Sequence, residues 1–488
     1  MKKISIVLIS ILVTMLLMTS CLNDFLNVEP ISETYSAKFW KTELEARTGL
    51  NSVYADFQNN FKSTGGMTYI GWFELRSDNC YGIPQGGSFL YSEVNMNKIY
   101  PSHPCSNWNV WYKSISMTNI AIYYIQKMED ISDVKKNNLL AEAYFLRAYC
   151  YFNLVRIWGD VPIVVKPLLS FSDVTYPAKD SSKLVMDSII LKDLNLAVSK
   201  ADPGKNDIHL FNVGALYSLY TDVAMWNHDY VNAEKYSDLL LKLNRYTLVS
   251  GPEFYKTVST AITTENIWTL KWSYINNGYN PVVQNLNTYT IVAKPLVDKW
   301  KTAEWRKDLR RPQTIDTLYN YYGFTHLIST DARASMWKYE PTTRVTSNTN
   351  EKFIPLYRLA DIVLLRAEAL NKLGRFQDAL DQLNTIRTRA GLPGRLLTDY
   401  DSATDKMLAI EDDILQERQF ELLGEGKRWF DLIRTGRAIS TMNKYFETYL
   451  KAYGVTNYKL FTDQWQLYWP VNKDNIVENE NLTQTGQY

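Results

Sequence analysis

Apolar residues recur at three- and four-residue spacing along most of the chain, which is the pattern of amphipathic helices. The pattern predicts helices over Trp108–Met128, Asn137–Ile157, Ser181–Val198, Val213–Trp226, Val231–Asn244, Leu356–Leu373, Phe376–Arg389 and Thr404–Leu423. Because these segments make up much of the chain, the sequence predicts a mainly α-helical fold.

The segment 356–389 carries a finer pattern. Ala367 precedes Gly374 by seven residues, and Phe376 and Ala379 follow at two and five residues beyond the glycine. This is the spacing of a tetratricopeptide repeat. Its alanines let two antiparallel helices approach closely, and its glycine ends the first helix without a Cβ penalty.

A weaker copy of this pattern follows the predicted helix 213–226. Tyr230 and Ala233 take the aromatic and small positions, while Thr221 and His228 replace the first alanine and the glycine. Further helix pairs are expected at 108–157 and 404–440. The four tetratricopeptide-like pairs are expected to stack into a helical scaffold.

Two long stretches, 63–104 and 251–349, lack this periodicity. The second holds five of the 14 tryptophans: Trp268, Trp272, Trp300, Trp305 and Trp337. Long irregular segments in a compact domain are usually functional or disordered, and a high aromatic content argues against disorder. We therefore expect an ordered, loop-rich lobe with short strands, mounted on the scaffold where binding sites usually lie.

The N-terminus has the layout of a secretory signal peptide. Lys2 and Lys3 precede an apolar run from Ile4 to Met18, and small residues then lead to Cys21. The apolar run is short for a bilayer span. The pattern resembles the lipobox of bacterial lipoproteins, which predicts cleavage after residue 20 and a lipid on Cys21. An ordinary signal peptide with an incidental cysteine is the alternative.

Charge and cysteine content narrow the function classes. The chain has 53 basic and 52 acidic residues, which argues against nucleic-acid binding. Cys150 lies in an apolar helical stretch and is expected to be a buried thiol. Cys80 and Cys105 lie in loop-like sequence and could pair in an exported protein, although spacing alone does not decide it.

Five segments, spread in order over the mature chain, together resemble the SusD/RagB family of outer-membrane lipoproteins. They are Cys21–Pro30, Ala141–Ala148 with Trp158–Pro162, Tyr357–Ala369 with Leu383–Pro393, Glu417–Leu422 with Gly426–Arg434, and Trp469–Val471 with Asn479–Gln484. The resemblance implies four tetratricopeptide-like helix pairs packed against an irregular lobe.

The resemblance also implies a location and a role. The protein would be lipid-anchored on the outer face of the outer membrane, as a lid over a SusC-like TonB-dependent transporter. It would capture an oligosaccharide, or a peptide as in some members of the family, and deliver it for uptake. No catalytic machinery and no cofactor are implied.

Candidate ligand-binding residues combine aromatic rings with polar side chains. Aromatic faces cover the C–H faces of sugars, while amides, carboxylates and guanidinium groups bond hydroxyls. The candidates are Arg76, Asp78, Asn79, Tyr81, Trp272, Tyr274, Asn277, Tyr279 and Tyr289. In contrast, Glu417, Arg418, Glu421, Arg428 and Asp431 lie at helical spacing and are expected to form structural ion pairs.

Enzymatic function is not expected. No motif marks the carboxylate pair of a glycosidase. The four histidines are far apart in the sequence, with no two-histidine metal motif. Neither a phosphate loop nor a glycine-flanked serine nucleophile is present. A purely structural protein-interaction scaffold is a further alternative, because helical arrays often bind proteins.

The predicted organisation divides the chain into five parts. They are a signal peptide at 1–20, a lipidated tail at 21–45, an N-terminal helical region at 46–250, an aromatic-rich irregular lobe at 251–349, and a C-terminal helical region at 350–488.

Overall fold

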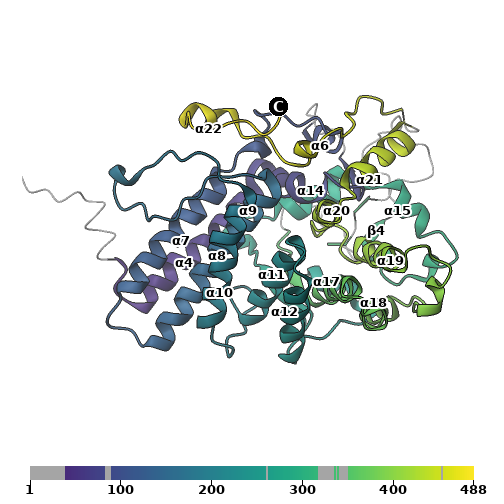
Figure 1. The fold of residues 1–488 in the computed structure, drawn as a ribbon, viewed down its shortest axis with the longest axis horizontal. Coiled ribbons are helices and arrows are strands. Elements are labelled where there is room, and N and C mark those ends of the chain that lie inside the picture. The colour runs from purple at the N-terminus through teal and green to yellow at the C-terminus, as the bar shows by residue number, and fades with distance from the viewer. Residues whose placement is uncertain are drawn as a thin grey trace, which may run out of the picture.

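The fold was obtained as a computed structural model that describes residues 39–82, 90–259, 262–316, 335–336, 338–339, 350–451 and 454–488. It is mainly α-helical, as the sequence predicts, with short strands in an irregular lobe (Figure 1). The signal peptide, Cys21 and Trp337 lie outside the described residues. Within the described part of the chain, every helix is too short or too polar to cross a membrane.

Four helices of the N-terminal half lie side by side: α4 (Glu43–Lys62), α7 (Asn109–Lys127), α8 (Asp133–Trp158) and α10 (Leu191–Lys200) (Figure 1). Helix α8 is the central one and is buried without interruption from Asn138 to Trp158. A helix that is apolar over most of its circumference is stable only when neighbours cover it on several sides, as α4, α7 and α10 do here.

A second row of helices follows: α11 (Val213–Trp226), α12 (Tyr230–Lys242), α17 (Leu359–Lys372), α18 (Phe376–Arg389) and α19 (Lys406–Glu421). Each packs against the next in this order. Ala367 and Ala379 are fully buried, and Gly374 has a φ of 75° at the end of α17. The predicted helix pairs at 213–244 and 356–389 are therefore confirmed.

The segment 404–440 holds the expected helix pair, α19 and the short helix α20 (Arg428–Arg434). A third helix, the short α21 (Ala438–Tyr445), follows α20. Gly436 lies between them with a φ of 70°, a conformation that L side chains rarely adopt, so the helix stops and restarts there.

Short strands form two sheets in the irregular lobe. The first has the antiparallel order β1 (Cys80–Gly82), β3 (Thr290–Val292), β5 (Ser335–Met336) and β4 (Ile315–Asp316). The second pairs β2 (Asn266–Leu270) with β6 (Ile354–Arg358). The remaining helices are α5 (Met67–Tyr69), α6 (Leu90–Asn95), α9 (Ser182–Val185), α13 (Tyr274–Asn277), α14 (Pro281–Tyr289), α15 (Lys294–Lys299), α16 (Arg311–Thr314) and α22 (Lys473–Glu478).

The tryptophans of the irregular lobe belong to its core. The side chains of Trp268, Trp272, Trp300 and Trp305 are at most 2% exposed. Trp300 and Trp305 both contact the ring of Phe420 on α19, at centroid distances of 4.6 and 4.2 Å. The aromatic residues thus join the lobe to the helical scaffold.

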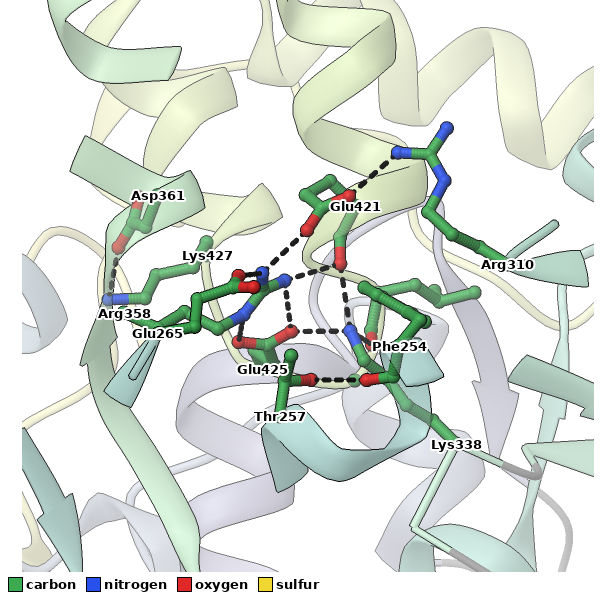
Figure 2. Close-up of polar contacts among 12 residues, drawn as sticks. Phe254, Thr257, Glu265, Arg310, Lys338, Arg358, Asp361, Glu421, Glu425 and Lys427 are labelled. Atoms are coloured by element: carbon green, nitrogen blue, oxygen red, sulfur yellow. Dashed lines mark hydrogen bonds and ion pairs between the residues drawn. The ribbon is translucent and has the colours of Figure 1, made fainter. Parts of the chain in front are cut away.

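A buried ion network makes the same connection (Figure 2). Arg358, at the end of β6, contacts Glu265 at 2.6 Å, Glu421 at 2.5 Å and Glu425 at 2.7 Å. Glu421 also contacts Arg310 at 2.8 Å, and Arg389 of α18 reaches it as well. The side chains of these five residues, like that of Arg358, lie in the protein interior: Glu265, Arg310, Arg389, Glu421 and Glu425.

Charges in the network are balanced by one another. Burial alone would raise the pKa of Glu421, but Arg389, Arg358 and Arg310 outweigh burial and hold that pKa well below its usual range. The sequence-based prediction that Glu417, Arg418, Glu421, Arg428 and Asp431 form ion pairs is confirmed.

The three described cysteines are free, buried thiols: Cys80, Cys105 and Cys150. Cys105 donates to the carbonyl of Met67 at 3.6 Å, while Cys80 faces the carboxylate of Glu74 at 3.8 Å. A disulfide between Cys80 and Cys105 is therefore absent, and the prediction of a buried Cys150 is confirmed. Burial raises the pKa of all three thiols.

Replacing Glu421 by glutamine should destabilise the protein strongly. The variant Glu421→Gln leaves three guanidinium groups short of a buried counter-charge, a loss that costs about 3–5 kcal/mol. Chemical unfolding followed by circular dichroism measures it. The exposed pair Lys183–Asp187 provides the control, since Asp187→Asn should leave the midpoint unchanged. Equal unfolding midpoints for the Glu421→Gln and Asp187→Asn variants would contradict the role of Glu421 as a stabilising buried counter-charge.

Asp361 should make stability depend on pH. Burial raises its pKa, but Lys427 and Arg418, each at 2.9 Å, dominate and lower the pKa from 3.8 to about 2. Figure 2 shows the contact with Lys427. This stabilisation is complete above pH 3.8, the ordinary value, and is lost as the pH falls through about 2. The native protein should be more stable to unfolding than the Asp361→Asn variant above pH 3.8. This difference in unfolding free energy should shrink by about 2 kcal/mol as the pH falls through about 2. A pH-independent difference in unfolding free energy would rule this out.

Thiol titration tests the cysteine assignment. With Cys21 replaced by serine, the mature chain should show three thiols in denaturant, with or without prior reduction. In the native state these thiols should react slowly, because they are buried and their pKa values are raised. One titratable thiol without reductant and three after reduction would instead reveal a Cys80–Cys105 disulfide.

Candidate functional site

The first group of predicted site residues leads into strand β1, and much of it is buried. Arg76 is 1% exposed and lies over the ring of Trp429, 4.8 Å from its centroid. Burial lowers the pKa of Arg76 to about 10. Asn79 donates to Glu74 at 2.7 Å and accepts from Gln419 at 3.1 Å. In this structure a soluble ligand does not reach Arg76 or Asn79, and both support the framework.

Two other predicted residues meet across the small sheet. Tyr81 of β1 pairs in register with Ile291 of β3, a strand that begins directly after Tyr289. Tyr81 is 9% exposed, and Tyr289 is half-buried against the ring of Tyr91, at a centroid distance of 5.8 Å. The sheet therefore brings the two sequence regions together, but it leaves little of either ring accessible.

The second predicted group forms a surface turn at residues 272–279, here called the Tyr274 turn. Trp272 is 2% exposed, and its indole donates to the carbonyl of Gly278 at 3.0 Å, which closes the turn. Asn277 donates to Gln58 of α4 at 3.0 Å. The backbone N–H of Tyr274 donates to the carboxylate of Glu351 at 2.8 Å. These bonds attach the turn to the scaffold at both ends.

The turn holds its remaining large side chains in solvent. Tyr274 is 45% exposed, Tyr279 37% and Ile275 93%. Aromatic rings fixed by the backbone and open on one face provide a contact surface at low entropic cost. Of the predicted residues in this turn, Tyr274 and Tyr279 are therefore the exposed ones, while Trp272 and Asn277 make the hydrogen bonds that hold the turn in place.

A cavity of about 440 Å³ lies among α19, α20, α21 and the start of α15, and it is here called the α19–α21 cavity. These helices lie together on the right of Figure 1. Asp78, a predicted site residue, lines it beside Gln416, Arg428 and Tyr445. Leu415, Leu432 and Pro295 add apolar surface. The cavity thus joins a residue of the N-terminal region to three helices of the C-terminal region.

Most charges around the cavity are paired. Arg428 binds Asp78 through two nitrogens, at 2.8 and 3.1 Å. Arg437 contacts Glu411 at 2.8 Å and also reaches Asp412. Lys444 is exposed and has no ion-pair partner within the described part of the chain. Counting the lining side chains, the three cations outnumber the two carboxylates of Asp78 and Asp412 by one.

Sequence reasoning missed most of this cavity. Thr441, Lys444 and Tyr445 lie three and four residues apart on one face of α21, and Tyr449 follows one turn later. Tyr449 lies in a π-helical turn, Phe446–Leu450, a kind of irregularity that is frequent at functional sites. The helical spacing of a lysine with two tyrosines was the available signal.

The site contains no recognisable metal centre. Among the described residues, no group of three or more His, Cys, Asp or Glu side chains could hold a metal ion. His103 is buried, and burial lowers its pKa to about 4. The two candidate surfaces therefore offer aromatic, hydroxyl, amide and guanidinium contacts.

Two family models match the chain. The model described as SusD family matches residues 254–488, and the model described as starch-binding associating with outer membrane matches residues 24–201. The chain is 27% identical to SusD-like protein P38 of Formosa agariphila, over 100% of this chain and 99% of that one.

Solved structures share the fold. A SusD superfamily protein from Bacteroides vulgatus matches with a TM-score of 0.75 and 20% identity, covering 92% of this chain and 100% of that one. Surface glycan-binding protein A from Bacteroides thetaiotaomicron, solved in complex with laminarihexaose, matches with a TM-score of 0.71 and 18% identity. That match covers 90% of this chain and 98% of the other.

Proposed function

We propose that this protein, which belongs to the SusD/RagB family, is a lipoprotein that binds an oligosaccharide at the cell surface and delivers it to a SusC-like TonB-dependent transporter. The family match supports glycan binding, since one matching model is described as starch-binding and one structural neighbour was solved with laminarihexaose.

The Tyr274 turn is the observation that carries the binding proposal. It presents Tyr274 and Tyr279 to solvent on a backbone that Trp272 and Asn277 fix to the scaffold. Each sugar ring has an apolar C–H face that packs on such a ring, and contacts with aromatic rings contribute about 0.5–1.5 kcal/mol beyond their buried area. Two exposed tyrosines on one turn thus provide two such contacts.

Attachment to the outer membrane follows from the proposed lipid on Cys21. A lipid anchor holds the folded body at the membrane without a spanning helix. Holding the binder beside a transporter raises the effective concentration of captured ligand at the entrance, which offsets a modest affinity. We propose the helical scaffold as the part that contacts the transporter and the irregular lobe as the part that holds ligand.

The protein is proposed to bind its ligand without cleaving it. Capture needs contacts that hold the ground state of the ligand, whereas hydrolysis needs a general acid and a second carboxylate placed across one bond. The Tyr274 turn provides contacts of the first kind.

Replacing Tyr274 and Tyr279 together by alanine should weaken oligosaccharide binding by about 10- to 100-fold, since two aromatic contacts are lost. The mature chain carrying Cys21→Ser is titrated by calorimetry with a panel of oligosaccharides and peptides. Trp272 is left intact because its burial makes Trp272→Ala a test of folding. The control is Tyr176→Ala, which removes a tyrosine that is 57% exposed at another place.

Other outcomes would redirect the proposal. Binding only to peptides would assign the protein to the peptide-capturing branch of the family, and product release from any oligosaccharide would overturn the binder role. Co-purification with the transporter distinguishes the surface that holds ligand from the surface that contacts the transporter. The Tyr274 and Tyr279 variants should keep this association, and its loss with unchanged ligand binding would place the turn at the protein interface.

A further inference from the structure

The α19–α21 cavity carries a charge that its own side chains do not neutralise. Arg428 is matched by Asp78, and Arg437 by Glu411 and Asp412, while Glu411 is also bound by Lys372 at 2.7 Å. Lys444 remains as an ammonium group without an ion-pair partner among the described residues. The lining therefore favours a ligand that carries negative charge.

Other polar groups that line the same cavity as Lys444 retain bonding capacity. Arg428 uses Nε and Nη2 on Asp78, but its Nη1 reaches only the carbonyl of Leu415 at 3.5 Å. Tyr445 is 4% exposed, and its hydroxyl makes no hydrogen bond to any part of the chain that the structure describes. Gln416 donates to Gln419 at 3.1 Å, which leaves its side-chain oxygen as an acceptor. Donors and acceptors thus line the same cavity.

Apolar surface completes the lining. The ring of Tyr449 lies 6.1 Å from that of Tyr445, and Leu415, Leu432 and Pro295 line the same cavity. An inorganic anion would use only the cations, whereas a ring with C–H faces would also cover the apolar part. A volume of about 440 Å³ lies within the range of small-molecule sites. The cavity is therefore suited to one short unit of a larger ligand.

We propose that the α19–α21 cavity binds an acidic sugar unit, meaning a hydroxyl-rich ring that bears a carboxylate or a sulfate group. The acidic group pairs with Lys444 and the free edge of Arg428, and the hydroxyls bond Tyr445 and Gln416. The inference rests on the proposed function, since it names a chemical class for the captured oligosaccharide and assigns a second contact surface to it.

Binding of small probes to the mature Cys21→Ser chain tests this assignment. The probes are methyl glucuronide, glucose 6-sulfate, methyl glucoside and inorganic phosphate, measured by calorimetry and by saturation-transfer NMR. We expect the carboxylate or the sulfate probe to bind about 10-fold more tightly than methyl glucoside, because a charge-assisted hydrogen bond is added. Raising the salt concentration should reduce this preference.

Two lysine variants make the test specific. Lys444→Gln should weaken binding of the acidic sugar by about 5- to 10-fold and leave methyl glucoside unchanged. Lys473→Gln, which removes an exposed lysine of α22 outside the cavity, should change neither. Tyr445→Phe and Tyr449→Ala separate the contribution of the Tyr445 hydroxyl from that of the Tyr449 ring.

Failure of this inference is distinguishable from failure of the proposed function. Equal binding of acidic and neutral sugars, or equal effects of the two lysine variants, would overturn the cavity assignment. Phosphate binding as tight as that of the acidic sugars would also overturn it, in favour of a simple anion site. If oligosaccharides still bind through the Tyr274 turn, the proposed function stands; if none binds, the proposed function itself is wrong.

Discussion

The buried ion network around Glu421 is the interaction on which the arrangement of this protein depends. Its members come from both parts of the molecule: Glu265 and Arg310 belong to the irregular lobe, Arg389 and Glu421 belong to helices α18 and α19, and Arg358 contacts both Glu265 and Glu421. Figure 2 shows Glu265, Arg310, Arg358 and Glu421. Buried charges are costly unless every one is matched, so the network is satisfied only when both parts are in register. It therefore specifies one arrangement of lobe and scaffold.

Both candidate surfaces lie on parts that this register positions. Asp78 and Arg428 meet across the cavity although 350 residues separate them in the chain. The Tyr274 turn is fixed by a bond from Asn277 to Gln58 on α4 and by one from its backbone to Glu351 just before β6. A binding surface assembled in this way is preorganised, which lowers the entropic cost of holding a flexible sugar chain.

Under the two proposals made above, the Tyr274 turn and the α19–α21 cavity would provide different kinds of contact to one captured sugar chain. Ring faces such as those of Tyr274 and Tyr279 would tolerate many sugars, because every pyranose ring has a C–H face. The charged groups Lys444 and Arg428 would discriminate between sugars by direction and charge. Contacts that are individually modest then act together on one chain, through the effective concentration that the first contact creates.

Helical periodicity and residue type, which are local properties, were enough to predict the α-helical fold, the helix pair at 356–389 and the ion pairs of α19. The same information could not decide which aromatic residues of the lobe face solvent. Trp272 and Tyr274 are two residues apart, yet one is 2% and the other 45% exposed. An irregular backbone has no repeat that relates a residue's position in the sequence to the direction of its side chain. Which side chains are buried is therefore known only from the packed structure.

The sequence by itself therefore determined the helices and their small-residue contacts, because these depend on neighbours within a few turns. It also indicated the family, because five motif segments follow one another in order along the chain. Tertiary structure alone decided that Arg76 and Asn79 are buried, that Cys80 and Cys105 stay apart as free thiols, and that Asp78 lines a cavity with Arg428 and Tyr445. Those outcomes depend on contacts between segments that are distant in the sequence. The free energy of each such contact depends on how the other charges and apolar surfaces of the core are packed around it.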